Sequence, residues 1–136
     1  MIYITRRERF CAAHRMFRND WSDEENLRIF GKCSNPNWHG HNYVLYVTVK
    51  GDPVENYGFF ININTLKQII NDIIIERIDH KNLNLEVSFM NGRIATTENL
   101  AMAIWDELKP AIEKEGASLH CVKIEETENN IVEYYG

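Results

Sequence analysis

Apolar and polar positions alternate with the period of a β-strand near the start of the chain, over residues 2–13. Residues 39–50 form a second such run, rich in β-branched and aromatic side chains, and residues 59–62 predict a short third strand. The long insertion between the first two runs predicts one short helix, which Ser22 caps, acidic residues open and Gly31 ends. The first half of the chain is therefore predicted to be mainly strand.

Two longer helices are predicted in the second half, where apolar residues recur at spacings of three and four. The first covers residues 64–77, and its apolar stripe consists of Leu66, Ile69, Ile70, Ile73 and Ile74. The second follows Thr96 and carries on one side Leu100, Ala103, Ile104, Leu108 and Ile112. Pro110 is expected to kink or split this second helix, because proline removes a helical hydrogen bond.

Two alternating segments, residues 118–128 and 131–135, close the chain as strands. The order of elements predicts an α+β fold in one domain spanning residues 1–136, with an antiparallel sheet and helices packed on one of its faces. The other face carries aromatic and β-branched residues and needs cover. Oligomerisation would cover this face and protect the strand edges, so the sequence predicts a homo-oligomer.

Composition argues against several classes of function. The chain of 136 residues has 44% hydrophobic and 26% charged residues, as in ordinary globular proteins. A net charge of -5 without a basic stripe argues against nucleic-acid binding. Neither a membrane span nor a signal peptide is expected, because no apolar stretch is long enough and the chain begins as a strand. Cys11, Cys33 and Cys121 lack paired spacing and suit reduced thiols in the cytoplasm.

The strongest chemical signal is the segment Trp38-His39-Gly40-His41-Asn42 at the start of the second strand. His39 and His41 point to the same face, because side chains alternate along a strand with a period of two. Taken alone, this pair is as compatible with ordinary histidines as with a metal site. His14 ends the first strand, however, and meets the pair if the two strands run antiparallel. Three imidazoles favour a zinc site of the catalytic kind, with one coordination position open.

Cys33 lies six residues before His39, across an Asn-Pro-Asn turn that can fold the thiol back beside the metal. A thiolate near Zn²⁺ or a protonated histidine has a lowered pKa and can act as a base or nucleophile. The alternatives are a fourth zinc ligand and an inert buried cysteine, and the residues alone leave all three open.

Carboxylates provide further candidates, each with an ordinary alternative. Asp79 beside His80 suits a proton relay in which the carboxylate fixes the imidazole tautomer, but adjacent side chains often point apart in a solvated loop. Glu126, on a closing strand, can accept two N–H donors from a heterocycle or simply be solvated. Glu98 has the ordinary explanation of an acid at a helix N-terminus.

Four segments in order resemble the 6-pyruvoyltetrahydropterin synthase family. They are Cys33-Ser-Asn-Pro-Asn-Trp-His39-Gly-His41-Asn-Tyr, Asp79-His80-Lys-Asn-Leu, Thr96-Thr97-Glu98-Asn99 and Glu126-Thr-Glu-Asn-Asn. The resemblance covers nearly the whole chain, from Phe10-Cys-Ala-Ala-His14 to the last strand. It implies the tunnelling fold, in which trimeric β-barrels stack into a homohexamer with active sites at subunit contacts.

The resemblance also implies a role for each candidate residue. Zinc would be held by His14, His39 and His41. Protons would be transferred by Cys33 as general base, with Asp79 and His80. The pterin ring would be anchored by Glu126, with Thr96, Thr97 and Glu98 around the pocket. The implied substrate is 7,8-dihydroneopterin triphosphate, which loses triphosphate and is reduced by electrons from its own side chain. The absence of dinucleotide and P-loop motifs agrees with this internal redox chemistry.

Two alternatives remain open at this stage. The first is the 6-carboxytetrahydropterin synthase of queuosine biosynthesis, although the gap between Cys33 and His39 resembles the pyruvoyl-forming branch more closely. The second is a non-catalytic pterin-binding oligomer in which zinc is structural.

Trp38 departs from the small residue common in the family, and it is expected to narrow the pocket or pack on the pterin. The candidate cations for the triphosphate are Arg15, Arg18, Lys32, Lys81 and Arg93.

Overall fold

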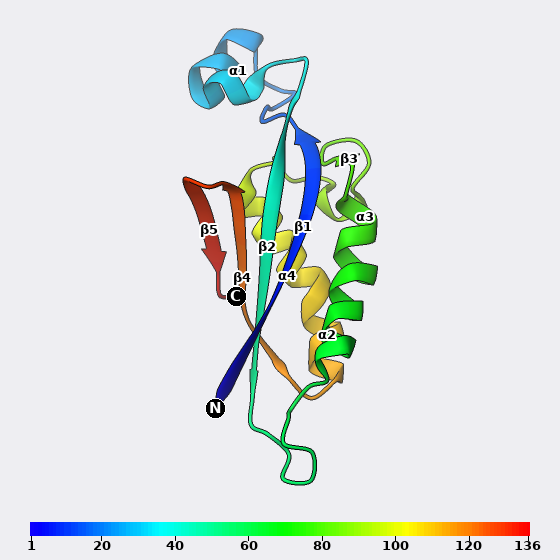
Figure 1. Ribbon diagram of the computed structural model, residues 1–136. Helices are drawn as coiled ribbons and strands as arrows, with labels where there is room; N and C mark the ends of the chain where they lie inside the picture. Colours follow the sequence, from blue (N-terminus) through cyan, green and yellow to red (C-terminus); the bar gives the residue numbers. More distant parts are fainter.

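A computed structural model describes residues 1–136, and its centre is a five-stranded sheet in the order β3-β1-β2-β4-β5 (Figure 1). β1 (Ile2–His14) and β2 (His39–Gly51) pair antiparallel along their whole length. β4 (Ser118–Thr127) pairs antiparallel with β2, and β5 (Asn130–Tyr134) pairs antiparallel with β4. The strands predicted at both ends of the chain are confirmed.

The prediction of a third strand over residues 59–62 is wrong. Residues 59–62 are not a strand, because β2 already has β1 and β4 on its two sides and leaves no edge for the segment that follows it. The strand beside β1 is β3 (Lys81–Asn82), which runs parallel to it and makes the sheet mixed. Two residues are too few to show a period, so this strand had no signal in the sequence.

The first long helix is a continuous helical segment made of α2 (Ile63–Ile70), the π-helical turn η2 (Asn71–Ile75) and α3 (Glu76–Ile78). Its fully buried residues recur at intervals of four, at Leu66, Ile70, Ile74 and Ile78. Side chains four apart drift around a regular α-helix, and the wider π turn reverses this drift and keeps the series on one face. The predicted amphipathic helix is confirmed.

α4 (Thr97–Lys114) is the second long helix, and the short 3₁₀ turn η3 (Ser88–Met90) lies before it. Thr96 caps α4 by accepting a hydrogen bond from the Asn99 amide at 3.2 Å. The predicted split at Pro110 is wrong, since α4 continues through the proline. The carbonyl that loses its partner belongs to exposed Asp106, where water can satisfy it, and the buried Leu108 lies on the opposite, packed side.

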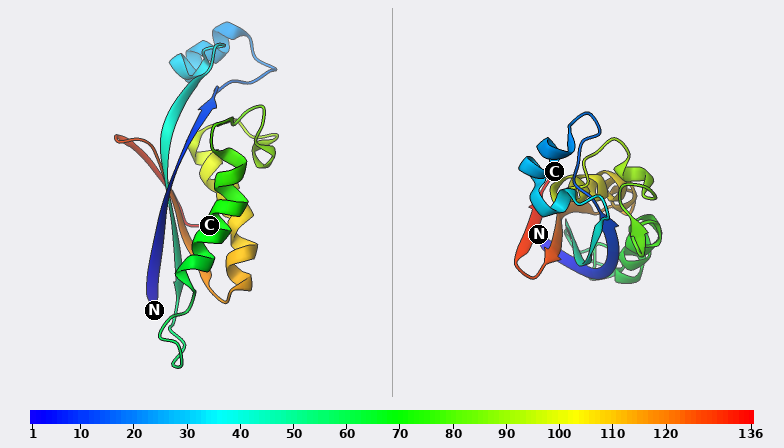
Figure 2. Two further views of the ribbon diagram at one scale, coloured as in Figure 1. Left: turned by 45° about the vertical axis from the view of Figure 1, so that its right-hand side comes forward. Right: turned by 90° about the horizontal axis from the view of Figure 1, so that it is seen from above.

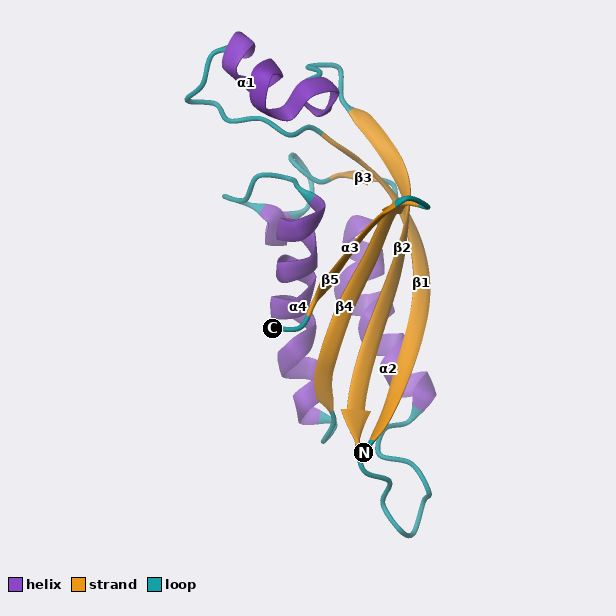
Figure 3. Ribbon diagram, turned by 90° about the vertical axis from the view of Figure 1, so that its left-hand side faces the viewer, coloured by secondary structure: helices purple, strands orange, loops and turns teal.

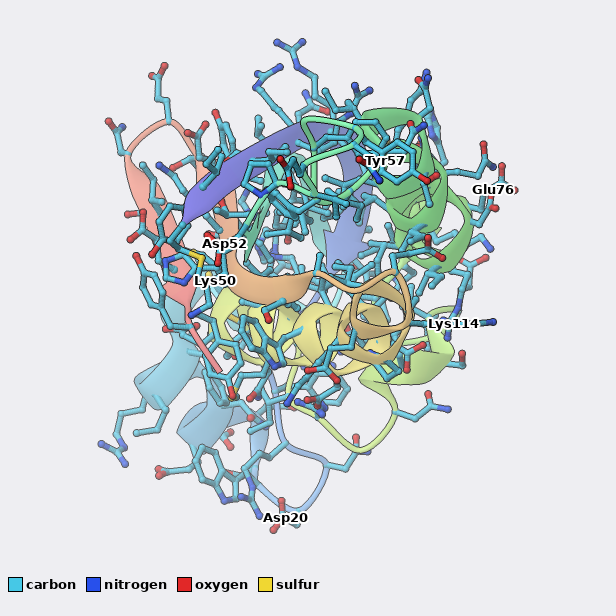
Figure 4. All side chains as sticks on the ribbon, turned by 90° about the horizontal axis from the view of Figure 1, so that it is seen from below. Asp20, Lys50, Asp52, Tyr57, Glu76 and Lys114 are labelled. Carbon is cyan, nitrogen blue, oxygen red and sulfur yellow. The ribbon has the colours of Figure 1, made fainter.

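The helices α2, α3 and α4 cover one face of the sheet, as Figures 2 and 3 show from two sides. A core of 26 buried residues lies between the sheet and the helices. Figure 4 shows Glu76 and Lys114 pointing outward from the helical layer, on the polar side of these helices. The α+β fold with helices on one face is confirmed. None of these helices combines the length and apolar character needed to cross a membrane.

The insertion between β1 and β2 projects beyond the end of the sheet (Figure 1). It contains α1 (Asp23–Phe30) followed by the 3₁₀ turn η1 (Gly31–Ser34). The Ser22 side chain accepts a hydrogen bond from the Glu25 amide at 3.1 Å, and Gly31 takes a φ of 58° where the helix ends. Both predicted boundaries of this helix are confirmed.

Candidate active site

The candidate residues gather mainly at one end of the sheet, the end that carries α1 and lies opposite the N-terminus (Figure 1). β1 and β4 finish at this end, and β2 and α4 begin there. The antiparallel register places His14 directly opposite His39, and His41 opposite Ala12. Three histidines from two strands therefore converge because of strand pairing and side-chain alternation alone.

The three imidazole rings form a compact group. The ring centroids of His14 and His39 are 4.4 Å apart, and that of His41 is 5.1 Å from both. His14 is 1% exposed, and its Nδ1 lies 2.7 Å from the carbonyl oxygen of Ala95. Because a carbonyl only accepts, this contact places the His14 proton on Nδ1 and leaves the Nε2 lone pair free.

One nitrogen of each ring is buried without a hydrogen-bond partner: His14 Nε2, His39 Nδ1 and His41 Nε2. The three side chains offer nitrogens within 4.8 Å of one another. Burial lowers the pKa of His14 and His39, and the neighbouring histidines add to this effect, so both rings favour the neutral form that binds a metal. Unpaired buried nitrogens facing a common point fit a metal ion, and the carbonyl behind His14 is the support that metal-ligating histidines usually have.

Glu126 continues the core-facing series of Val122 and Ile124 and lies beside this group. The pairing of β4 with β5 is irregular between Glu125 and Thr127, so Glu126 has no direct partner on β5. Its Oε1 is 3.9 Å from His41 Nε2, and its Oε2 accepts a hydrogen bond from the buried Thr97 hydroxyl. The structure thus brings Glu126 and Thr97 to the histidines and holds the carboxylate in one orientation.

The other residues at the start of α4 differ from Thr97. The Thr96 side chain is used to cap the helix, so it shapes the backbone. Glu98 lines a cavity of about 470 Å³ together with Glu126, Thr97 and Cys33. Such a cavity, with a fixed carboxylate on its wall, is suited to a heterocyclic ligand that donates N–H groups.

Cys33 lies in η1 and joins two cavities. It lines the one that contains Glu126, and it also lines a cavity of about 760 Å³ shared with His39 and His41. The backbone carbonyl of Cys33 accepts a hydrogen bond from the Met16 amide at 2.8 Å, which anchors the turn to the chain just after β1. Cys33 and the two histidines of β2 therefore border one cavity.

Asp79 and His80 form a pair of their own at the edge of β1. Asp79 Oδ1 accepts the Cys11 amide at 2.9 Å, and Asp79 Oδ2 is 3.0 Å from His80 Nδ1. Burial acts to raise the pKa of Asp79, but the Cys11 amide and His80 outweigh it, and the pKa lies below its usual value. His80 adopts a φ of 60°, and its side chain is 81% exposed.

The cavities that this pair lines differ from the two that Cys33 lines. Cys33 and the Asp79–His80 pair therefore do not meet in a common cavity of one chain. The imidazole of His80 is exposed at the surface of the chain.

The basic residues that are candidates for binding the triphosphate differ in the cavity that they line and in whether a carboxylate already pairs with them. Arg15 and Lys32 line the cavity of Cys33 and the histidines, whereas Lys81 lines a cavity with His80. Arg18 and Arg93 line a third cavity, but each is 2.7 Å from a carboxylate, of Asp20 and Asp106 respectively. Arg15 and Lys32 are thus the cations beside the histidine group.

Trp38 forms a wall between two cavities, the one of Cys33 and the one of Arg18 and Arg93. Its φ of 67° is unusual for a bulky residue. The predicted narrowing of the pocket agrees with this position.

Two groups at the site were not predicted from the sequence. The Ala95 carbonyl has no sequence signal, whereas strand parity places Tyr43 on the face of His39 and His41.

Fold and site together define a class of protein: an α+β domain with a three-histidine group suited to a metal ion, beside a cysteine and an oriented carboxylate. The sequence profile of 6-pyruvoyl tetrahydropterin synthase matches residues 3–136. The chain is 47% identical over 135 residues to the 6-pyruvoyl tetrahydrobiopterin synthase of Dictyostelium discoideum, covering 99% of this chain and 96% of that protein. The chain belongs to the 6-pyruvoyl tetrahydropterin synthase family.

A solved structure agrees with this assignment. The 6-pyruvoyl tetrahydropterin synthase of Caenorhabditis elegans superimposes with a TM-score of 0.92 at 36% identity, covering 99% of this chain and 95% of that one. The similarity to the 6-carboxy-5,6,7,8-tetrahydropterin synthase of Bacillus subtilis is lower, at 30% identity over 97 residues, or 69% of this chain and 62% of that protein. The comparisons therefore favour the pyruvoyl-forming branch.

Proposed function

We propose that this protein converts 7,8-dihydroneopterin triphosphate into 6-pyruvoyltetrahydropterin, with elimination of triphosphate and no external reductant. The observation that carries the proposal is the convergence of three unpaired histidine nitrogens with Cys33 and Glu126. These are the groups that the reaction requires: a metal site, a proton carrier and an anchor for the pterin ring.

The metal in this proposal is zinc, held by His14, His39 and His41, because an all-imidazole ligand set with an open position suits this ion. When bound, zinc supplies Lewis-acid polarisation of the oxygens on the substrate side chain. Cys33 borders the same cavity and is the general base that takes protons from the substrate carbons. The lowered pKa values of His14 and His39 favour the neutral imidazoles that such a metal site needs.

Recognition of the ring is assigned to Glu126, whose carboxylate accepts hydrogen bonds from the N–H groups of the pterin. The Thr97 hydroxyl occupies one lone pair of this carboxylate and keeps it aimed at the cavity. Glu98 lines the same space, and Thr96 contributes by fixing the start of α4. Arg15 and Lys32 are the cations available to the triphosphate, since neither Arg18 nor Arg93 is free of a carboxylate.

The Asp79–His80 pair completes the proton-transfer set from a second chain. The exposed imidazole of His80, held by Asp79 through Nδ1, supports this arrangement. The sheet face that no helix covers supports an assembly in which sheets close into trimeric barrels and two trimers form a hexamer (Figure 3). Three free cysteines agree with a cytoplasmic location.

The test is to incubate the zinc-loaded protein with 7,8-dihydroneopterin triphosphate and to identify the products by mass spectrometry. A 6-pyruvoyl product with released triphosphate is expected. A 6-carboxy product with acetaldehyde would instead place the protein in the queuosine branch, and unchanged substrate would refute the proposal. Cys33→Ala should abolish turnover, and Cys121→Ala is the matched control because this thiol is buried within β4 and lines neither of the cavities that Cys33 lines.

A further inference from the structure

Tyr43 has a hydroxyl group that the fold leaves without a partner. The residue is only 1% exposed, and its hydroxyl oxygen is one of four buried side-chain atoms that lack a hydrogen bond. The other three are the nitrogens of His14, His39 and His41 that face the metal site. All four unpaired atoms therefore belong to one cluster at the end of the sheet.

The ring of Tyr43 is held firmly in this cluster. It stacks on Phe10 with a centroid distance of 4.8 Å and an interplanar angle of 13°. Its contact with His41, two residues earlier on the same face of β2, is edge-on at 5.5 Å. The ring of His14, on the neighbouring strand, is also edge-on to it, with a centroid distance of 6.2 Å. The tyrosine is thus fixed against two of the three histidines of the candidate metal site.

A buried hydroxyl without a partner is costly, and native structures rarely keep one without a reason. The protein groups around Tyr43 have other uses: the histidine nitrogens suit a metal, and one Glu126 oxygen already accepts from Thr97. The missing partner is therefore an acceptor that arrives with the ligand. A neutral phenol is a donor that suits an oxygen gaining negative charge.

We propose that the Tyr43 hydroxyl donates a hydrogen bond to a side-chain oxygen of the bound substrate, and that this bond strengthens as the oxygen changes from hydroxyl to carbonyl. The identity of the substrate rests on the function proposed above. No proton leaves Tyr43 in this step. The tyrosine acts as a fixed donor, while Cys33 carries the proton taken from carbon.

The test compares Tyr43→Phe with Tyr46→Phe in the zinc-loaded assembly. The control hydroxyl lies on the opposite face of β2 and is already paired, with Glu125 at 3.2 Å. Tyr43→Phe should lower kcat about 100-fold with little change in KM, because a donor used mainly in the transition state is lost. Its zinc content should match that of the wild type, and its melting temperature should be equal or higher, since an unpaired hydroxyl is removed.

Tyr46→Phe should keep the kcat of the wild type. A Tyr43→Phe enzyme with an unchanged kcat would overturn the inference, and so would one that changes only in KM. Loss of zinc or a lower melting temperature in step with activity would also overturn it, because the hydroxyl would then be structural. An inactive wild type would overturn both this inference and the proposed function, whereas an active wild type with an equally active Tyr43→Phe overturns only the inference.

Discussion

Replacing His80 separates the backbone role of this position from its chemical role. The residue is held at a φ of 60° while its side chain is 81% exposed, so a change there removes almost no packing within the chain. Glycine and alanine both delete the imidazole and its contact with Asp79. The two variants then differ chiefly in their tolerance of the left-handed conformation. The difference between their free energies of unfolding therefore measures the cost of this backbone conformation.

The expected difference follows from two opposing contributions. A residue with a Cβ pays about 1–2 kcal/mol in the left-handed region, a cost that glycine avoids. Glycine loses more backbone freedom on folding, at a cost of about 0.5–1 kcal/mol. His80→Gly should therefore be more stable than His80→Ala by about 0.75 kcal/mol, the difference between the midpoints of these two ranges, or about 2–4 °C in melting temperature for a chain of this size.

Urea unfolding and thermal melting, at one fixed protein concentration, measure this difference, and turnover of the pterin triphosphate is measured in parallel. Both variants should lose activity equally, by a factor of about 10²–10⁴, because both lack the imidazole proposed to transfer protons. Equal stability of the two variants would refute the backbone reasoning. Retained activity in either variant would refute the role assigned to His80.

In the metal-free protein, burial holds the pKa of His14 and His39 below the ordinary 6.5, so the unfolded chain binds more protons than the folded one in acid. The free energy of unfolding should then fall as the pH drops below about 6.5, and equal urea midpoints at about pH 7.5 and about pH 5.5 would contradict this. Zinc at 100 times its Kd should raise the free energy of unfolding by about 2.7 kcal/mol, and an equal gain in His14→Ala would exclude the histidine site. Thr97→Val deprives a Glu126 oxygen of its donor and should raise KM about 10-fold, whereas an unchanged KM would show that the hydrogen bond does not orient the carboxylate. Cys33→Ala should bind zinc and pterin normally without turnover, and loss of zinc would identify the thiol as a fourth ligand.

Much of the fold follows from local patterns that the sequence displays directly. The buried series of the two long helices repeats every three or four residues, and the caps at Ser22 and Thr96 act within one turn of chain. Strand parity also placed His39 and His41 on one face and, with antiparallel pairing, brought His14 to them. The candidate metal site was predictable because it depends only on alternation and on the pairing of neighbouring strands.

Tertiary structure decided the features that depend on contacts between distant segments. Residues 59–62 read as a strand, but both sides of β2 were already occupied, and the two residues of β3 took the edge of β1 instead. Whether Pro110 ends α4 depended on which carbonyl lost its partner and whether water could reach it. These outcomes are set by competition among segments for the same neighbours, which no local window of sequence records.

In the candidate site, too, local sequence determined some features and contacts between distant segments determined others. By itself the sequence identified the chemistry: three imidazoles, a thiol, a carboxylate and an Asp–His pair, each carried by a short motif. Only the folded chain paired Glu126 with Thr97, put the Ala95 carbonyl behind His14, and separated His80 from Cys33. The sequence gives the type of each side chain directly, whereas the orientation of a buried polar group depends on partners that long-range packing brings to it.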